Sequence, residues 1–195
     1  MGMPVAARAV AVFCGSRTGH DPAALMAAQA LGQGLAAGGF TLVYGGGRVG
    51  LMGAVADAAL AGGGRVIGVI PDFLTRREVA HEGLTELHVT DSMHSRKQLM
   101  FTLADAFVTL PGGFGTLDET IEILTWAQLD QHAKPVFICD VGGWAAPLLA
   151  AFRATVAQGY ASAGSLDLFE VVADVPALLG RLRDIPHVGG DAARL

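Results

Sequence analysis

The sequence predicts a single α/β domain built on a mostly parallel, doubly wound sheet of the Rossmann type, with helices on both faces. Short, almost wholly apolar runs alternate with longer amphipathic stretches along the chain. Strands covered on both faces have this continuous apolar pattern, and helices connect parallel strands. The 195 residues are enough to bury a core. We assign residues 1–184 to this domain and expect 185–195, which contain two adjacent glycines, to form a flexible C-terminal tail.

Each apolar run is assigned to a strand and each longer stretch to a helix. The first run, Ala9–Cys14, leads straight into Gly15-Ser16, which fits a strand better than a signal peptide. Asp21-Pro22, Ser92 and Thr116 are N-capping signals for three of the helices. In chain order the predicted strands are 9–14, 40–44, 66–70, 86–89, 106–110, 136–139 and 170–172, and the predicted helices are 22–37, 50–61, 92–104, 116–130, 144–158 and 175–183.

The composition argues against several classes of protein. Hydrophobic residues make up 52% of the chain and charged residues 16%, so we expect part of the surface to be buried against a second copy. A net charge of −5 argues against a nucleic-acid partner, which would require a basic face. No run approaches the roughly 20 apolar residues of a membrane span. Cys14 and Cys139 each end an apolar run and are predicted to be reduced core residues, so we expect a cytoplasmic protein.

Three predicted strands end in loops of glycine or small residues: Cys14-Gly15-Ser16, Gly45-Gly46-Gly47 and Pro111-Gly112-Gly113. In a doubly wound sheet, ligands bind beyond the carboxyl ends of the strands. We therefore expect all three loops to line one crevice.

The second of these loops matches a dinucleotide-binding pattern. Gly45, Gly47 and Gly50 satisfy G-x-G-x-x-G, and Asp72 follows about twenty residues later. A nicotinamide-dependent oxidoreductase is therefore an alternative function. Two features weaken it, because the motif follows the second strand instead of the first and Pro71 stiffens the backbone beside Asp72. Tight packing of a strand against a helix would also require these glycines.

The third loop is more specific for an anion. Glycines at 112, 113 and 115 would let the backbone approach a phosphate, and the helix predicted to start near Thr116 would direct its N–H groups at it. No Gly-Lys-Ser/Thr follows, so we predict a monophosphate and not a nucleoside triphosphate. A purely structural turn is the alternative.

Two interpretations of Glu119 remain open. Thr116 to Glu119 has the pattern of a capping box, in which the glutamate only binds a backbone N–H. A phosphate at the helix start would compete for those donors and leave Glu119 to face the sugar. Glu122 lies one turn further on, on the same side of the helix.

Arg96 and Lys97 form a cationic pair upstream of the loop. At helical spacing they share a face with Met93 and Met100. Adjacent cations usually mark a solvated surface, but cations in an apolar face need an anionic partner, which a phosphate or Glu119 would supply.

Three stretches together resemble the Lonely Guy (LOG) family of cytokinin riboside 5′-monophosphate phosphoribohydrolases. They are 45–53 (GGGRVGLMG), 93–97 (MHSRK) and 111–119 (PGGFGTLDE), and the resemblance covers roughly residues 9–183. It implies a homodimer that hydrolyses the N-glycosidic bond of a nucleoside 5′-monophosphate. We expect no cofactor, and no metal because the six histidines have no metal-ligand spacing and no cysteine pair accompanies them. The products would be ribose 5-phosphate and the free base, a cytokinin or adenine.

The resemblance also implies roles for individual residues. Arg96 and Glu119 match the catalytic pair of the family. One departure is Arg17-Thr18, where the family often has further serines. The positions that the resemblance assigns to substrate binding are Ser16, Glu82, Arg96, Lys97, Gly112, Gly113, Phe114, Gly115, Thr116, Glu119 and Thr125.

The family has often carried the label lysine decarboxylase, which the residues support poorly. A pyridoxal phosphate enzyme needs a Schiff-base lysine, and Lys97 and Lys134 are the only lysines in the sequence. Lys134 precedes a predicted strand, at the wrong end of the sheet for the crevice. The sequence leaves open whether the base is adenine or a prenylated adenine, and how Arg96, Glu119 and Glu122 divide the chemistry. A non-catalytic nucleotide-binding or carrier protein is a further alternative.

Overall fold

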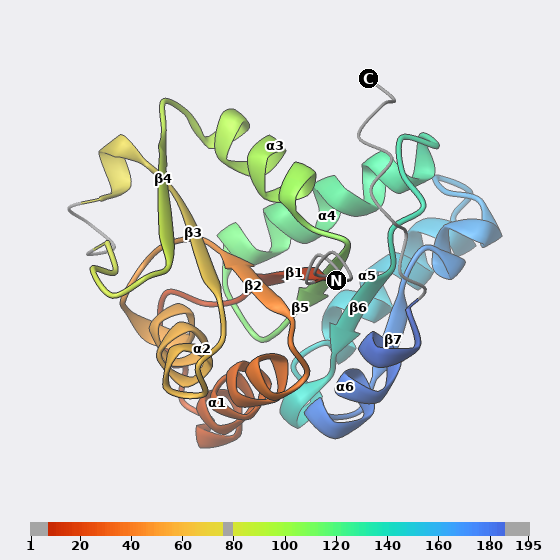
Figure 1. The fold of residues 1–195 in the computed structure, drawn as a ribbon. Helices are drawn as coiled ribbons and strands as arrows, with labels where there is room; N and C mark the ends of the chain where they lie inside the picture. The colour runs from red at the N-terminus through yellow and green to blue at the C-terminus, as the bar shows by residue number, and fades with distance from the viewer. Residues whose placement is uncertain (1–7, 76–79, 186–195) are drawn as a thin grey trace, which may run out of the picture.

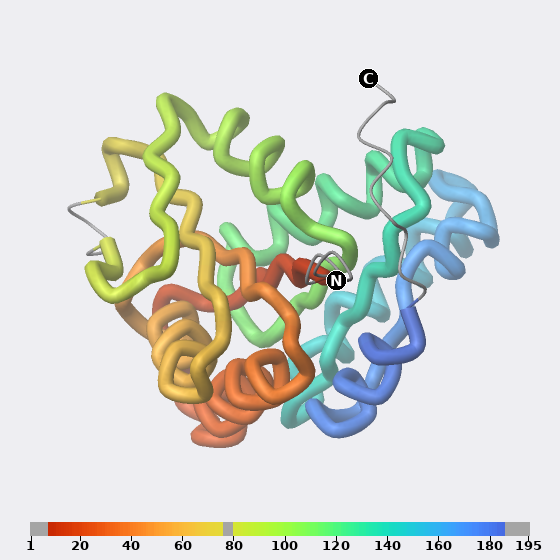
Figure 2. Tube along the Cα trace, in the orientation of Figure 1, coloured from red at the N-terminus to blue at the C-terminus, as the bar shows by residue number. Residues whose placement is uncertain are grey.

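A computed structural model describes residues 8–75 and 80–185 (Figures 1 and 2). Within these residues seven strands form one sheet in the order β4-β3-β2-β1-β5-β6-β7, and all neighbouring strands are parallel. The predicted α/β sheet is therefore confirmed. The strands are β1 Ala9–Phe13, β2 Thr41–Tyr44, β3 Val66–Pro71, β4 Glu86–Thr90, β5 Ala106–Thr109, β6 Val136–Cys139 and β7 Glu170–Val172.

Helices cover both faces of the sheet (Figure 1). Leu31 of α1, Val55 of α2 and Leu178 of α6 are fully buried in the core on one face. On the other face Met100 of α3 and Ile123 of α4 pack against the central strands, and α5 covers β6. The α-helices of the described residues are α1 Pro22–Ala37, α2 Gly50–Ala61, α3 Met93–Leu103, α4 Phe114–Gln128, α5 Ala146–Ala157 and α6 Val175–Asp184.

The order of the strands places a topological switch point between β1 and β5. From β1 the chain proceeds outward through β2 and β3 to β4, and α3 then returns it to β5 on the other side of β1. Ligands of doubly wound sheets bind at such a reversal. The two loops that leave β1 and β5 are in contact there, because the N–H of Gly15 donates to the carbonyl oxygen of Pro111 at 3.0 Å. Two of the three predicted loops thus meet at the switch point.

The predicted cap at Thr116 is wrong, and so is the capping box to Glu119. Helix α4 begins at Phe114, its N-cap is Gly113, and no side chain caps it. The first bond of the helix runs from the N–H of Leu117 to the carbonyl oxygen of Gly113 at 3.1 Å, which leaves the N–H groups of the first turn without a cap from a side chain. The caps at Asp21 and Ser92 are confirmed: Asp21 accepts from the N–H of Ala23, and Ser92 forms a capping box with Ser95.

The predicted C-terminal tail follows the last helix. Helix α6 ends at Asp184, and the tail predicted for 185–195 lies, apart from Ile185, outside the described residues.

No helix in the described part of the chain is both long enough and apolar enough to cross a lipid bilayer.

Candidate active site

A cleft of about 670 Å³ opens at the carboxyl ends of β1 and β5. This volume lies within the range of about 300–1,000 Å³ that is usual for small-molecule sites. The walls come from the β1–α1 loop, the starts of α2, α3 and α4, and the segment after β6. The lining residues are Cys14 to Asp21, Ala24, Leu51, Met52, Leu74, Met93, Arg96, Pro111 to Thr116, Glu119, Val141, Gly142 and Trp144.

The N-terminus of α4 has features that suit an anion. Its first turn lines the cleft and carries no side-chain cap. No atom lies within 4 Å of where a Cβ would stand on Gly113 or Gly115, so a ligand can approach the backbone closely. Gly112 has a packing role, because a Cβ there would lie 2.0 Å from the hydroxyl oxygen of Thr116. N–H groups at a helix start bind phosphate through hydrogen bonds and the helix dipole.

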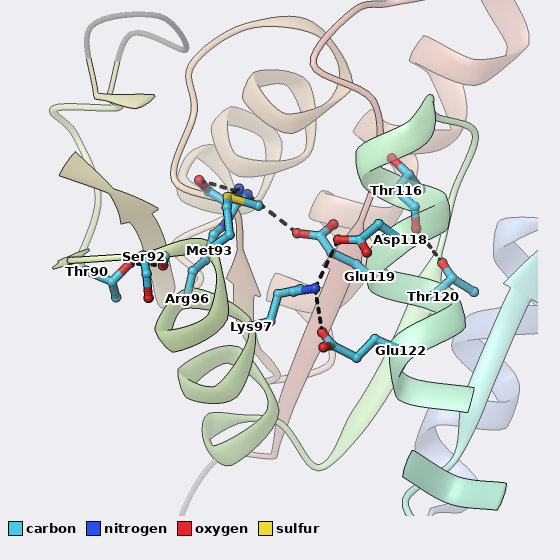
Figure 3. A network of polar contacts seen from close by, with 11 residues as sticks. Thr90, Ser92, Met93, Arg96, Lys97, Thr116, Asp118, Glu119, Thr120 and Glu122 are labelled. Carbon is cyan, nitrogen blue, oxygen red and sulfur yellow. Dashed lines mark hydrogen bonds and ion pairs between the residues drawn. The ribbon is translucent and has the colours of Figure 1, made fainter. Parts of the chain in front are cut away.

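Arg96 and Glu119 lie together in the wall of this cleft (Figure 3). Both residues are buried, with 5% and 8% of their surface exposed. The Nη2 of Arg96 lies 3.6 Å from Oε1 of Glu119 and donates to the carbonyl oxygen of Gly45 at 3.4 Å. The buried Nε of Arg96 has no hydrogen-bond partner among the described residues. A buried guanidinium with long contacts and an unused donor is suited to an additional anionic or hydroxyl ligand.

Gly45, the first glycine of the dinucleotide pattern, makes room for Arg96. A Cβ on Gly45 would lie 2.1 Å from Nη2 of Arg96. The glycine is therefore explained by the packing of a side chain in the cleft, without a bound pyrophosphate.

The N-terminus of α2 is occupied by the chain itself. The carbonyl oxygen of Gly15 accepts from the N–H groups of Leu51 at 2.9 Å and Met52 at 3.3 Å. Gly50 has φ +63° and touches the backbone of the β1–α1 loop. Because these N–H groups are already satisfied, the structure argues against a dinucleotide at G-x-G-x-x-G and supports the packing interpretation of its glycines.

Replacing Gly50 by alanine is expected to destabilise the protein by about 2 kcal/mol or more. The new Cβ would lie 2.3 Å from the carbonyl carbon of Ser16, and a side chain at φ +63° is strained. Urea unfolding should show a lower midpoint with an unchanged slope. Gly180→Ala is the matched control: Gly180 lies in α6 with nothing within 4 Å of where its Cβ would stand, so stability should stay equal or rise. Equal stabilities for the two variants would contradict the packing role.

Lys97 does not line the cleft. Its Nζ lies 2.9 Å from Oε2 of Glu122 and donates to Oδ2 of Asp118 at 3.1 Å, both on α4. Partial burial by itself would lower the pKa of Lys97, but the hydrogen bonds and charges of Glu122 and Asp118 outweigh it and raise the pKa. The ammonium thus stays charged and occupied by two carboxylates.

Of the other residues that the sequence assigned to the site, some line the cleft and others lie elsewhere. Ser16 and Phe114 line the cleft, and 92% of the surface of Phe114 is exposed. Glu82 is exposed and is not among the lining residues. Thr125 lies instead on a shallow groove between α4 and α5. Met100, expected to share the face of Arg96 and Lys97, is buried in the core at 1% exposure, and Arg96 and Met100 are the buried residues of α3.

Cys14 lies at the cleft but is unsuited to act as a nucleophile. Burial, with a smaller contribution from the charge of Glu119, raises the pKa of its thiol far above the ordinary value. The thiol is therefore protonated at neutral pH, and thiolate is the reactive form.

The sequence reasoning missed one wall of the cleft, formed by Val141, Gly142 and Trp144. They follow β6, whose carboxyl end also opens into a pair of glycines, Gly142-Gly143. The same signal that identified the other loops was therefore present at a fourth strand end. Met52 and Leu74 carry no comparable signal, since each is a single apolar residue beside an apolar segment.

Lys134 lies away from the cleft, as predicted. Its Nζ donates to the carbonyl oxygen of Phe101 at 2.8 Å and stands 4.1 Å from the centre of that ring. Burial lowers the pKa of Lys134, and Asp105 partly opposes this. Neither lysine of the chain lines the cleft where a Schiff base would have to form.

The fold and the cleft together define an α/β protein with a helix N-terminus and a buried Arg–Glu pair in a cleft at its switch point. Residues 52–182 match a family model described as a possible lysine decarboxylase. A probable cytokinin riboside 5′-monophosphate phosphoribohydrolase of Oryza sativa subsp. japonica is 47% identical over 91% of this chain and 78% of its own length. A cytokinin riboside 5′-monophosphate phosphoribohydrolase of Rhodococcoides fascians is 42% identical over 90% of this chain and 89% of its own length. The chain belongs to the LOG family of cytokinin riboside 5′-monophosphate phosphoribohydrolases.

A solved structure supports the fold at lower identity. The Moco carrier protein of Chlamydomonas reinhardtii superposes with a TM-score of 0.68 at 21% identity, covering 91% of this chain and 96% of that protein. At this level of identity the likeness concerns the fold alone.

Proposed function

We propose that this protein hydrolyses the N-glycosidic bond of adenosine 5′-monophosphates, including N6-modified ones, to the free base and ribose 5-phosphate. The observation that carries the proposal is the buried Arg96–Glu119 pair, which shares a cleft with the uncapped N-terminus of α4. Membership of the LOG family supports it, since relatives at 42–47% identity are named for this activity.

The proposed reaction places the 5′-phosphate on the first turn of α4. Glu119 is five residues further along the helix than Phe114, a rise of about 7 Å, so a sugar anchored by its phosphate extends toward the carboxylate. The bond from C1′ to the base nitrogen breaks through an oxocarbenium-like state. Water adds its oxygen to C1′ and loses a proton, and the base leaves with the bonding electrons and takes up a proton.

Glu119 has two roles open to it in this step. Its carboxylate can stabilise the positive charge at C1′ or accept the proton of the attacking water. Arg96 would orient Glu119 or the ribose hydroxyls, or assist departure of the base. These roles of Arg96 make different demands on charge and shape, which substitution by lysine or alanine separates.

The reaction is tested by incubating the protein with AMP, isopentenyl-AMP and other nucleoside monophosphates and separating the released bases by chromatography. Adenine or its N6-substituted form should appear with an equal amount of ribose 5-phosphate. Binding of AMP with no free base after overnight incubation would indicate a carrier protein instead. Binding of reduced nicotinamide dinucleotide, detected by its fluorescence, would favour the oxidoreductase.

We further propose a homodimer. Ile121 on α4 and Leu129, directly after this helix, are exposed with 46% and 61% of their surface accessible, and burying them against a second copy would be favourable. Thr125 lies on α4 as well, so packing of a second copy against this helix would give Thr125 a way to contact a substrate. Light scattering after size-exclusion chromatography should give twice the chain mass of 20.0 kDa, and the chain mass alone would contradict the dimer.

A cytoplasmic location without nucleic-acid or membrane partners completes the proposal. It is supported by the net charge of −5 and by Cys14 and Cys139, which are buried free thiols.

A further inference from the structure

Helices α3 and α4 are bridged by a three-residue ion cluster close to the cleft (Figure 3). Nζ of Lys97, on α3, contacts the carboxylates of Asp118 and Glu122, which lie one turn apart on α4. The Lys97 side chain is only 15% exposed and that of Glu122 23%, so the cluster is partly shielded from water. Partly buried pairs are screened less by salt than exposed ones.

One turn further along both helices the contact is apolar. The rings of Phe101 on α3 and Trp126 on α4 pack edge to face with their centres 5.0 Å apart. The two helices are thus held together by aromatic packing away from the cleft and by charges beside it. Loss of the charged contact would leave the cleft ends of the helices the freer of the two.

The residues of the Arg96–Glu119 pair directly neighbour this cluster along the chain. Arg96 precedes Lys97, and Glu119 follows Asp118. The distance of 3.6 Å from Arg96 to Glu119 is longer than a hydrogen bond, and Nε of Arg96 has no partner among the described residues. Because no hydrogen bond joins these two side chains directly, the relative placement of α3 and α4 contributes to their spacing.

We propose that Lys97, with Asp118 and Glu122, is a positioning bridge that sets the spacing of Arg96 and Glu119. This inference rests on the proposed function of the same site. The bridge differs from the direct contact of Lys97 with the substrate that the family resemblance implies. It also removes Glu122 from the acid–base chemistry, because the charge of Glu122 is matched by that of Lys97. Shifts of about 1 Å between reacting groups can cost roughly a hundredfold in rate.

A double-mutant cycle separates positioning from substrate binding. The proteins are wild type, Lys97→Met, Glu122→Gln and the double variant, with AMP as the substrate. Lys97→Met should lower kcat about ten- to a hundredfold with KM changed less than about threefold. Its effect should be smaller in the Glu122→Gln background, because the two residues act through one contact. Lys97→Arg, which keeps the charge, should recover a large part of kcat.

Two outcomes would overturn the bridge. One is a rise of KM for AMP, and of the Kd for ribose 5-phosphate measured by calorimetry, at unchanged kcat. The other is a Lys97→Met effect of equal size in both backgrounds. Arg181→Met, which breaks the exposed contact of α6 with Glu170, is the matched control and should leave kcat within about twofold.

The same proteins distinguish failure of the bridge from failure of the proposed function. If wild type releases no base from any nucleoside monophosphate, the proposed function fails. The bridge is then read from urea unfolding of the four proteins, in which Lys97→Met and Glu122→Gln should again be non-additive. Additive effects on stability would overturn it independently of catalysis.

Discussion

Replacing Glu119 by glutamine is expected to lower kcat for base release from AMP by about 10²- to 10⁴-fold. Glutamine keeps the size of the side chain and an oxygen for Arg96, but it can neither stabilise an oxocarbenium charge as an anion nor take a proton from water. Binding of the phosphate should survive, because the first turn of α4 is unchanged. Single-turnover release of adenine, followed by chromatography, measures the step directly.

The control for Glu119→Gln is Glu170→Gln. Glu170 lies on the edge strand β7, and this change removes its carboxylate from the exposed ion pair with Arg181. It should retain wild-type rates. Thermal unfolding should remain cooperative in both variants, so that a loss of rate is not a loss of fold. Full activity of Glu119→Gln would remove Glu119 from the chemistry and leave the cleft without its proposed carboxylate.

Replacing Arg96 by alanine is expected to lower kcat/KM for AMP by about 10²- to 10³-fold. The substitution removes the cation of the cleft wall that lies 3.6 Å from Glu119. It also removes a positive charge that lies 3.6 Å from the buried carboxylate of Glu119, so stability should fall by about 3 kcal/mol. Base release and urea unfolding measure the two effects separately.

Arg96→Lys distinguishes charge from shape. A lysine supplies the positive charge but lacks the planar fork that reaches Gly45 and Glu119 together. If Arg96 only balances the charge of Glu119, the lysine variant should recover most of the lost rate. If Arg96 orients Glu119 or the ribose hydroxyls, it should stay close to the alanine variant. An alanine variant with wild-type kcat/KM would exclude both roles.

The fold was predictable from the sequence because the strands are continuous apolar runs between helical stretches. Helices 22–37 and 50–61 and strands 136–139 and 170–172 have the predicted bounds. The start of α4 was not predictable from the side chains that usually cap helices, because the N-cap residue is Gly113, which has no side chain. Thr116 resembled a cap but lies inside the helix, with its hydroxyl against Gly112.

The candidate site was predictable where loops follow strand ends, and less so along the helices. Helical spacing placed Arg96, Lys97 and Met100 on one face, but adjacent residues differ by about 100° around the axis. That rotation is enough to direct Lys97 toward α4 and Arg96 into the cleft, whereas Met100, one turn after Arg96, lies on the same buried side of α3 and reaches the core. A pattern on one helix cannot state which neighbouring element each side chain meets, because that depends on tertiary packing.

The bond from the Gly15 carbonyl to the start of α2 has a consequence for ligand selection. The Gly15 carbonyl competes with any ligand for the N–H groups at the start of α2. Because it belongs to the same chain, its effective concentration there is set by the chain itself. A dinucleotide would have to displace it before placing a second phosphate there, whereas a monophosphate uses only the open end of α4. Discrimination against dinucleotides would then reside in the β1–α1 loop. Changes to that loop, more than changes at the glycine motif, would be the way to alter it.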